Sequence, residues 1–422
     1  MKIYKNFVFL SFLIFLLSPF LAHALEQETT DKPEFVFAIL ATYRTRENLV
    51  DKALEQNILA YNINFNSEID FEKGVMRKVF QRDKNKRWIR ASEAPLPDVV
   101  YDFGVYKNNP KNKEKAKLLK AQLHDLGIPF INPETDTMEP VNNKRLFAKI
   151  MAKNNIPHPK THTFSKRNLK NMYKKYDQLY IKPTFGSKGY GIITIEKSPN
   201  LSTFSIGYKI KNKKEKKWVT IREENINKKK LYAKVSEARK KIKQTNARYI
   251  IQQGILTYKY QDKLTDFRFN VQRGELGVQK VSGYQMRIGG NLAQGGRPGN
   301  SQIVLQPLEL DKDIDHGDLI QKCNHIAILT ATALEKKLKQ KIGDIGIDIV
   351  LDTAGNPYVV EANGKNGFMS TYIEKNPQVD TLFGLPPALE ECKQLDGAHE
   401  DALLEYARFL SQSSKDFASS NS

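Results

Sequence analysis

The chain has 422 residues, of which 40% are hydrophobic and 27% are charged, and its formal net charge is +20. This length permits one large hydrophobic core or two to three smaller ones. The low mean hydropathy excludes a polytopic membrane protein.

The first 24 residues have the pattern of a secretory signal. Lys2 and Lys5 precede an apolar run over residues 7–17, and Ala-His-Ala at 22–24 matches the A-x-A cleavage pattern. We therefore expect cleavage after Ala24 and export, with no stable membrane span in the mature protein. Two alternatives stay open: an uncleaved segment that anchors the protein in a membrane, or a cytoplasmic protein whose translation starts downstream.

Residues 35–140 are expected to form an N-terminal α/β domain after a flexible linker at 25–34. The apolar pattern predicts strands over 35–40, 58–63 and 98–101, and helices over 47–56 and 113–126. Strands that alternate with helices indicate an open α/β layer.

A glycine-rich loop follows a helix predicted over 142–154, which Asn142 or Asn143 caps and which carries Lys144 near its start. Strand-like runs at 179–182 and 192–195 flank this loop. Its backbone N–H groups and nearby lysines could hold a phosphate, although an ordinary loose hairpin explains the pattern too. The residues concerned are Lys182, Gly186, Ser187, Lys188, Gly189, Tyr190 and Gly191.

Residues 209–243 contain fifteen Lys and Arg against four Glu. This basic stretch predicts attraction of a polyanionic polymer rather than specific nucleic-acid binding, because its aromatic residues have no regular spacing. Residues 228–243 are expected to form a solvated helix with Leu231, Val235, Ala238 and Ile242 on one side.

Toward the C-terminus, Cys323 belongs to a periodic apolar helix and is interpreted as a small buried hydrophobe. A disulfide with Cys392 is the alternative for an exported protein. Residues 376–422 are expected to form an extension with helices near 387–395 and 399–410, and a disordered tail from Ser411.

The segment 343–363 is the most informative part of the chain. Read as a hairpin that turns at Ala354-Gly355, it places Asp348 opposite Glu361, with Asn363 on the same face. Two carboxylates so close repel each other unless a cation lies between them, and oxygen ligands suit Mg²⁺. A solvated acidic hairpin remains the alternative.

The order of these motifs resembles the ATP-grasp superfamily, and more narrowly its endospore-coat-associated YheC/YheD-like branch. The similarity covers about residues 35–372. It implies a mixed α/β (α+β) ATP-grasp fold, in which a two-lobed ATP-grasp region over 141–375 follows the small N-terminal open α/β domain. The motifs, in chain order, are 142–147, 180–183, 186–191, 249–254, 266–268 and the hairpin.

The resemblance also implies roles for individual residues. Lys144 and Lys182 match phosphate-binding lysines, and Gln252, Gln253, Gly254 and Ile255 match the strand and hinge that hold adenine. Asp348, Glu361 and Asn363 match the Mg²⁺ ligands, and Arg268 and Arg287 match arginines that steady the transferred phosphate and the carboxylate. For each single lysine or arginine, a solvated basic surface is the alternative.

These assignments predict an ATP- and Mg²⁺-dependent ligase that joins a small-molecule or peptide carboxylate to an amine or a thiol through an acyl phosphate. The alternative is a non-catalytic nucleotide-binding protein of a coat or other structural assembly. Export conflicts with the need for ATP, which is scarce outside the cytoplasm.

Overall fold

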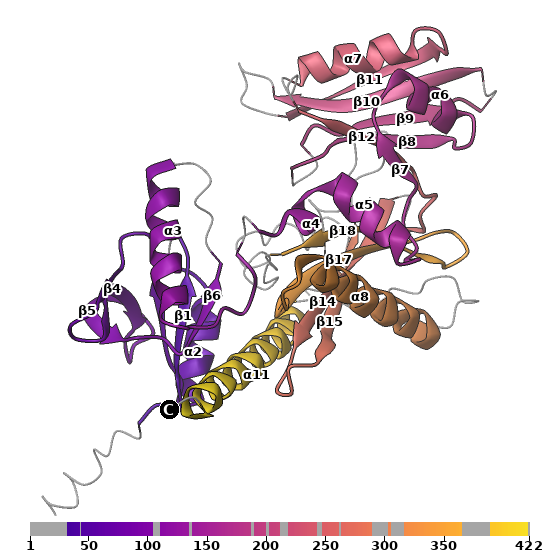
Figure 1. Ribbon diagram of the computed structural model, residues 1–422. Coiled ribbons are helices and arrows are strands. Elements are labelled where there is room, and N and C mark those ends of the chain that lie inside the picture. Colours follow the sequence, from indigo (N-terminus) through magenta and orange to yellow (C-terminus); the bar gives the residue numbers. More distant parts are fainter. Residues whose placement is uncertain are drawn as a thin grey trace, which may run out of the picture.

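The computed structural model of this protein contains three β-sheets flanked by helices (Figure 1). The predicted signal peptide and most of the predicted linker lie outside the described residues, as do Ser187, Lys188 and Gly189 of the glycine-rich loop. The described residues are 32–42, 44–103, 110–134, 137–186, 190–199, 202–211, 218–242, 247–260, 263–288, 303–304, 316–364 and 389–420.

The first sheet forms the N-terminal domain, in the order β3-β4-β2-β1-β6 with β5 beside β4. The predicted α/β pattern is confirmed, since β1 pairs in parallel with both β2 and β6. The polar β3–β5 hairpins were not predicted. The elements are β1 (Val36–Leu40), α2 (Glu47–Glu55), β2 (Leu59–Ile63), β3 (Glu68–Asp70), β4 (Val75–Arg82), β5 (Trp88–Pro95), β6 (Val99–Asp102) and α3 (Pro110–Asp125).

Strand β1 is apolar along its whole length because both of its faces are buried. Phe37 and Ile39 pack in one core with α2, whereas Ala38 and Leu40 pack in another with Leu119 of α3 and its neighbours. The two helices therefore cover opposite faces of this sheet.

A single long helix, α11 (Leu389–Ser420), packs against the N-terminal domain and also against β14 (Lys263–Arg273) and β15 (Gln279–Ile288) of the third sheet. Leu403, Leu404 and Ala407 of α11 lie in the core that contains Phe37, and Arg408 binds the carboxylate of Glu34 at 2.6 and 2.9 Å. The predictions of two separate helices and of a disordered tail from Ser411 are thus wrong over residues 389–420. The apolar face of α11 gains its stability from packing against the distant sheet.

The second sheet is antiparallel, in the order β11-β10-β9-β8-β12-β7. Helices α6 and α7 pack against it, and α7 buries Leu231, Val235 and Ala238 as predicted. The elements are β7 (Thr161–Thr163), α6 (Lys166–Tyr173), β8 (Gln178–Pro183), β9 (Ile193–Lys197), β10 (Thr203–Lys211), β11 (Trp218–Asn227), α7 (Leu231–Lys241) and β12 (Tyr249–Gln253).

The third sheet has the order β16-β15-β14-β17-β18, with β13 beside β14. Its core includes α8, on which Cys323 is buried as predicted and is free, and α5, whose N-cap Asn143 accepts hydrogen bonds from the N–H groups of Arg145 and Leu146. No helix among the described residues is long and apolar enough to cross a membrane. The elements are α4 (Glu139–Asn142), α5 (Lys144–Lys153), β13 (Lys259–Tyr260), β14 (Lys263–Arg273), β15 (Gln279–Ile288), β16 (Ile303–Val304), α8 (His316–Leu338), β17 (Asp344–Leu351) and β18 (Pro357–Asn363).

Candidate functional site

The β17–β18 hairpin has the predicted register at its open end. Asp348 lies opposite Glu361, and Gly346 lies opposite Asn363. The predicted two-residue turn is wrong, because Leu351 pairs with Pro357 and a longer loop joins the strands. The longer loop shifts the pairing near the turn by one residue. A β-bulge next to Asp348 removes this shift, so that Asp348 pairs with Glu361 as predicted.

The carboxylate of Asp348 is held by three donors on its own sheet. Arg268 lies opposite it on β14 and donates from Nε and Nη2 at 2.5 and 2.9 Å. Arg287 Nη2 lies 3.1 Å from Oδ2, and Asn363 Nδ2 donates to the same oxygen at 3.1 Å. Gln285, Arg268, Asp348 and Glu361 thus form a polar row across four neighbouring strands.

The two arginines determine the ionisation of Asp348. Burial acts to raise the pKa of the Asp348 carboxyl, but Arg268 and Arg287 outweigh burial and hold the pKa below its ordinary value. Asp348 is therefore a carboxylate at neutral pH although its side chain is only 8% exposed.

Asp266 is a member of this cluster that the predicted site residues did not include. It lies opposite Arg287 on the neighbouring strand and accepts hydrogen bonds from the Nε of Arg287, at 2.7 Å, and from its Nη2. Asp266 and Arg268 are two residues apart in β14 and share a face. A charged pair with period two inside a buried strand is the signal that could have identified Asp266.

Lys144 joins the glycine-rich loop to the acidic hairpin. Its Nζ donates to the carbonyl oxygen of Gly186 at 2.7 Å and to Oε1 of Glu361 at 3.0 Å. Lys144 is the first residue of α5, and its own N–H donates to the carbonyl oxygen of Thr184 at 3.0 Å. The second and third sheets therefore meet at this lysine.

Lys182 lies close to the same group of charges. Its Nζ donates to Oε1 of Gln252 at 2.6 Å, and Gln252 Nε2 donates in turn to Thr161 Oγ1 at 3.0 Å. Burial lowers the pKa of Lys182 to about 8, while Glu361 opposes this shift and Lys144 adds to it.

This lowered pKa predicts a pH dependence of nucleotide binding. The affinity for ATP should fall as pH rises through about 8, because Lys182 then loses the charge that attracts phosphate. Calorimetric titration with ATP between pH 7 and 9 measures the change in affinity. The affinity should fall by at most about tenfold per pH unit. Lys182→Arg should flatten the profile, and an equally steep profile in this variant would contradict the assignment.

The glycine-rich loop has two described glycines in the left-handed region, Gly186 with φ +138° and Gly191 with φ +82°. Between them, the ring of Tyr190 packs on that of Trp218 with centroids 5.0 Å apart. Both rings are exposed at the surface, by 44% and 49%. The start of β11 thus supports the far end of the loop.

Trp218 should report on nucleotide binding. The chain has two tryptophans, so Trp88→Phe leaves Trp218 as the sole indole. Because its ring packs on Tyr190, saturating ATP should change its emission, and adding Tyr190→Ala should abolish most of that change. A fluorescence titration with no response in the Trp88→Phe protein would contradict phosphate binding at this loop.

The predicted adenine-binding segment continues β12 into a turn. The N–H groups of Gln253 and Gly254 donate to the carbonyl oxygens of Lys160 and Gln178 at 2.9 and 2.8 Å. A Cβ at Gly254 would lie 2.5 Å from the Gln178 side chain, which explains the glycine. Ile255 is buried.

The donor set fits Mg²⁺ in chemistry. Asp348, Glu361 and Asn363 offer oxygens from two paired strands, which are the ligands that Mg²⁺ prefers. Lys144 and Arg268 bind the two carboxylates, so a metal ion would compete with these cations. The described residues contain no group of three or more His, Cys, Asp or Glu side chains that could hold a metal ion, and the third ligand of the proposed set is the amide of Asn363.

The structure thus brings together most of the described site residues. Lys144, Lys182 and Gly186 lie with Glu361, while Arg268, Arg287 and Asn363 gather on Asp348. Gln252 reaches the group through Lys182. Gln253 and Gly254 bind Lys160 and Gln178 through their N–H groups, and Tyr190 packs on Trp218.

Two sequence comparisons match this chain to known proteins. Residues 128–385 match the family described as YheC/D-like ATP-grasp. The chain is 24% identical over 314 residues to the endospore coat-associated protein YheD of Bacillus subtilis, a match that covers 71% of this chain. The match spans 63% of the length of that relative.

Solved structures are similar to this chain at low sequence identity. The D-alanine-D-alanine ligase of Coxiella burnetii has a TM-score of 0.50 and 12% identity, with 92% of this chain and 99% of that chain covered. The ATP-grasp ligase PsnB, complexed with a minimal precursor, Mg and ADP, has a TM-score of 0.47 and 10% identity, with 86% and 97% covered.

Proposed function

Because the chain belongs to the YheC/D-like ATP-grasp family, we propose that it is an ATP-dependent ligase that uses Mg²⁺ to join a carboxylate to an amine or a thiol. The observation that carries this proposal is the position of Lys144. It contacts both Gly186 of the glycine-rich loop and Glu361 of the acidic hairpin, so a phosphate cradle adjoins a set of metal ligands.

The reaction would proceed in two displacements. A carboxylate oxygen of the substrate attacks the γ-phosphorus of ATP and ADP leaves, which forms an acyl phosphate. The nitrogen or sulfur nucleophile then attacks the acyl carbon, loses its proton and expels inorganic phosphate. Positioning and charge neutralisation supply most of the acceleration in such phosphoryl transfers.

The residues of this chain have different roles in the proposed reaction. Lys144 and Lys182 bind phosphate oxygens and offset their charge. Arg268 and Arg287 bind Asp348 in the structure, so we assign them a positioning role on that carboxylate before any contact with substrate. Mg²⁺, held by Asp348, Glu361 and Asn363, would neutralise charge on the triphosphate.

The direct test is turnover. Purified protein is mixed with ATP, Mg²⁺ and panels of carboxylates, including peptides, together with amines and thiols, and the release of ADP and phosphate is measured. An amide or thioester product from any pair supports the ligase. Nucleotide binding without turnover across the whole panel would contradict it.

A second candidate is a non-catalytic nucleotide-binding component of a coat. The name of the B. subtilis relative, an endospore coat-associated protein, favours it and also favours a location outside the cytoplasm. The N-terminal sequence of the mature protein from cells tests the export part of this idea, because cleavage after Ala24 leaves Leu25 first.

The basic stretch could add a polyanionic partner to either function. Part of its charge is already paired, since Lys234 binds Glu223 at 3.0 Å and Lys241 binds Glu237 at 3.1 Å. Exposed pairs of this kind contribute little to stability and are weakened by salt. Binding of a polyanion should therefore weaken as salt rises.

A further inference from the structure

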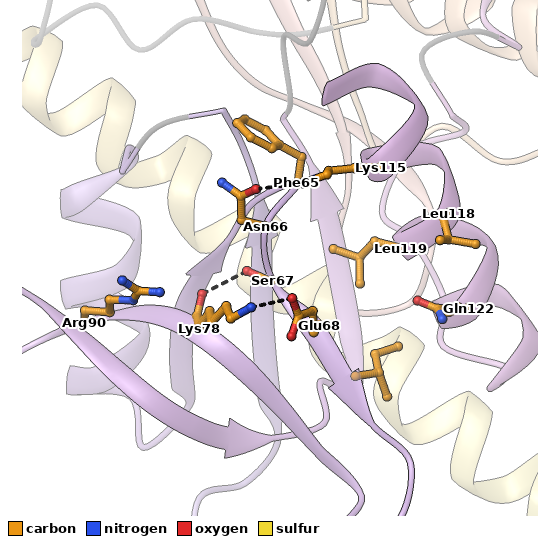
Figure 2. A pocket seen from close by; sticks show the side chains of 11 residues that line it. Phe65, Asn66, Ser67, Glu68, Lys78, Arg90, Lys115, Leu118, Leu119 and Gln122 are labelled. Carbon is orange, nitrogen blue, oxygen red and sulfur yellow. Dashed lines mark hydrogen bonds and ion pairs between the residues drawn. The ribbon is translucent and has the colours of Figure 1, made fainter. Parts of the chain in front are cut away.

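A hollow region lies in the N-terminal domain, between strands β3 and β4 and helix α3 (Figure 2). The cavity has a volume of about 640 Å³, within the range of small-molecule sites. An adjoining hollow of about 730 Å³ on β4 and β5 shares Glu68, Lys78 and Arg90 with it. Strands β4 and β5 lie at the left of Figure 1, away from β17 and β18 and from the strands of the second sheet.

Three cations line the cavity from both of its sides. Lys78 and Arg90 come from β4 and β5, Lys115 comes from α3, and Glu68 is the only carboxylate of the lining. Lys78 Nζ binds Glu68, and Lys115 Nζ donates to Asn66 Oδ1 at 3.4 Å. Arg90 is exposed, and no carboxylate in the described part of the chain pairs with it. The lining of the cavity therefore carries a net positive charge.

Apolar side chains also line the cavity. Leu118 of α3 is 63% exposed and adjoins the buried Leu119, and Ile69 and Phe65 line the same space. Figure 2 shows Leu118, Leu119 and Gln122 on the helix side and Arg90 and Lys78 across from them. An occupant with an apolar body would remove Leu118 from water.

The backbone of β4 is strained at the point where it lines the cavity. Lys78 has φ +60° inside β4, a conformation that costs non-glycine residues about 1–3 kcal/mol. Ser67 Oγ donates to its carbonyl oxygen at 3.0 Å and holds it there. At this residue β4 exchanges its partner, since Arg77 pairs with β3 and Phe80 pairs with β2, and the cavity lies beside the exchange.

We propose that this cavity binds an organic anion with an apolar body, namely a carboxylate that ends an acyl or a peptide chain. The carboxylate lies between Arg90, Lys115 and Lys78, and the chain lies on Leu118. Guanidinium and ammonium groups bind carboxylates with strong, charge-assisted hydrogen bonds. The site is separate from the nucleotide site and does not depend on ligase activity.

Calorimetric titration of the full chain with octanoate tests the proposal, with the neutral octanamide and inorganic phosphate as comparison probes. Octanoate should bind, and each comparison probe should bind about tenfold more weakly, because each lacks one of the two required parts. Equal binding of octanamide, equal binding of phosphate, or no binding of octanoate at millimolar concentration would overturn the proposal.

Variants that are expected to change the affinity for octanoate in opposite directions make the test more specific. Arg90→Gln should weaken octanoate about tenfold, whereas Lys84→Gln, an exposed cation on the same hairpin outside the cavity, should change it by less than about twofold. Glu68→Gln should tighten binding, because it releases Lys78 and removes a repelling charge. Equal effects of Arg90→Gln and Lys84→Gln, or weaker binding in Glu68→Gln, would refute the site.

The source of the anion needs one further comparison. A short acetylated peptide that ends in leucine is titrated with its C-terminus free and with it amidated, beside octanoate. Tighter binding of the free-acid peptide than of octanoate identifies a chain end as the ligand, and the reverse order identifies a free acid. Equal binding of the free and amidated peptides would show that the carboxylate is not recognised and would overturn the proposal.

Discussion

Asp348→Asn combined with Glu361→Gln should lower the affinity for ATP in the presence of Mg²⁺ by about 100-fold, or about 2.8 kcal/mol. The two carboxylates lie opposite each other on β17 and β18 and supply the charged oxygens of the proposed metal site. Without them, Mg²⁺ loses its anionic ligands and triphosphate loses its bridge to the protein.

The same variant should behave oppositely when EDTA removes the metal. Lys144 and Arg268 then keep their charges without their carboxylate partners, and Arg287 keeps only Asp266, so metal-free ATP should bind equally well or more tightly. This change of sign separates a metal site from a general loss of structure. Affinity in Mg²⁺ that equals that of the unaltered protein would refute the metal assignment.

Two controls belong to this experiment. Asp318→Asn removes an exposed carboxylate from α8 and should leave ATP affinity in Mg²⁺ unchanged. Glu361→Gln alone should retain the fold, because its side chain is 34% exposed, and should still weaken binding in Mg²⁺. Thermal melting of each variant verifies that the comparison is made on folded protein.

Arg268→Met should lower the free energy of unfolding by about 3–5 kcal/mol. The substitution removes the bidentate partner of Asp348, whose side chain is only 8% exposed. Two buried carboxylates, Asp266 and Asp348, would then share the single guanidinium of Arg287. Urea unfolding at neutral pH measures the loss.

Arg77→Met is the matched control, because it breaks the Arg77–Asp70 ion pair at the surface of the N-terminal domain. Such a pair contributes about 0–1 kcal/mol. Similar losses in the two variants would show that the Arg268 pair gives no more stability than a surface pair.

The pH dependence gives this prediction a second readout. The folded-state pKa of Asp348 is depressed, so its pairing stabilises the protein above the unfolded-state value of about 4. That contribution is lost as pH falls through the folded-state pKa. The difference in stability between Arg268→Met and the unaltered protein should therefore shrink in acid.

The sequence by itself determined those features that depend on neighbours in the chain. Alternation with a period of two placed Asp348 opposite Glu361, and N-capping by Asn143 placed Lys144 at the start of α5. Even here the turn was wrong, because the pattern of side chains does not reveal a bulge that shifts one strand by a residue.

Tertiary structure alone decided the partners of the site residues. Asp266 acquires its role because β14 lies between β15 and β17, and the arginines are positioned on Asp348 by that strand order. Likewise, α11 is one ordered helix because it packs against a sheet formed by residues far away in the chain. Local propensities are fixed within a few residues, whereas strand order and helix docking depend on the burial of surfaces that meet only in the folded chain.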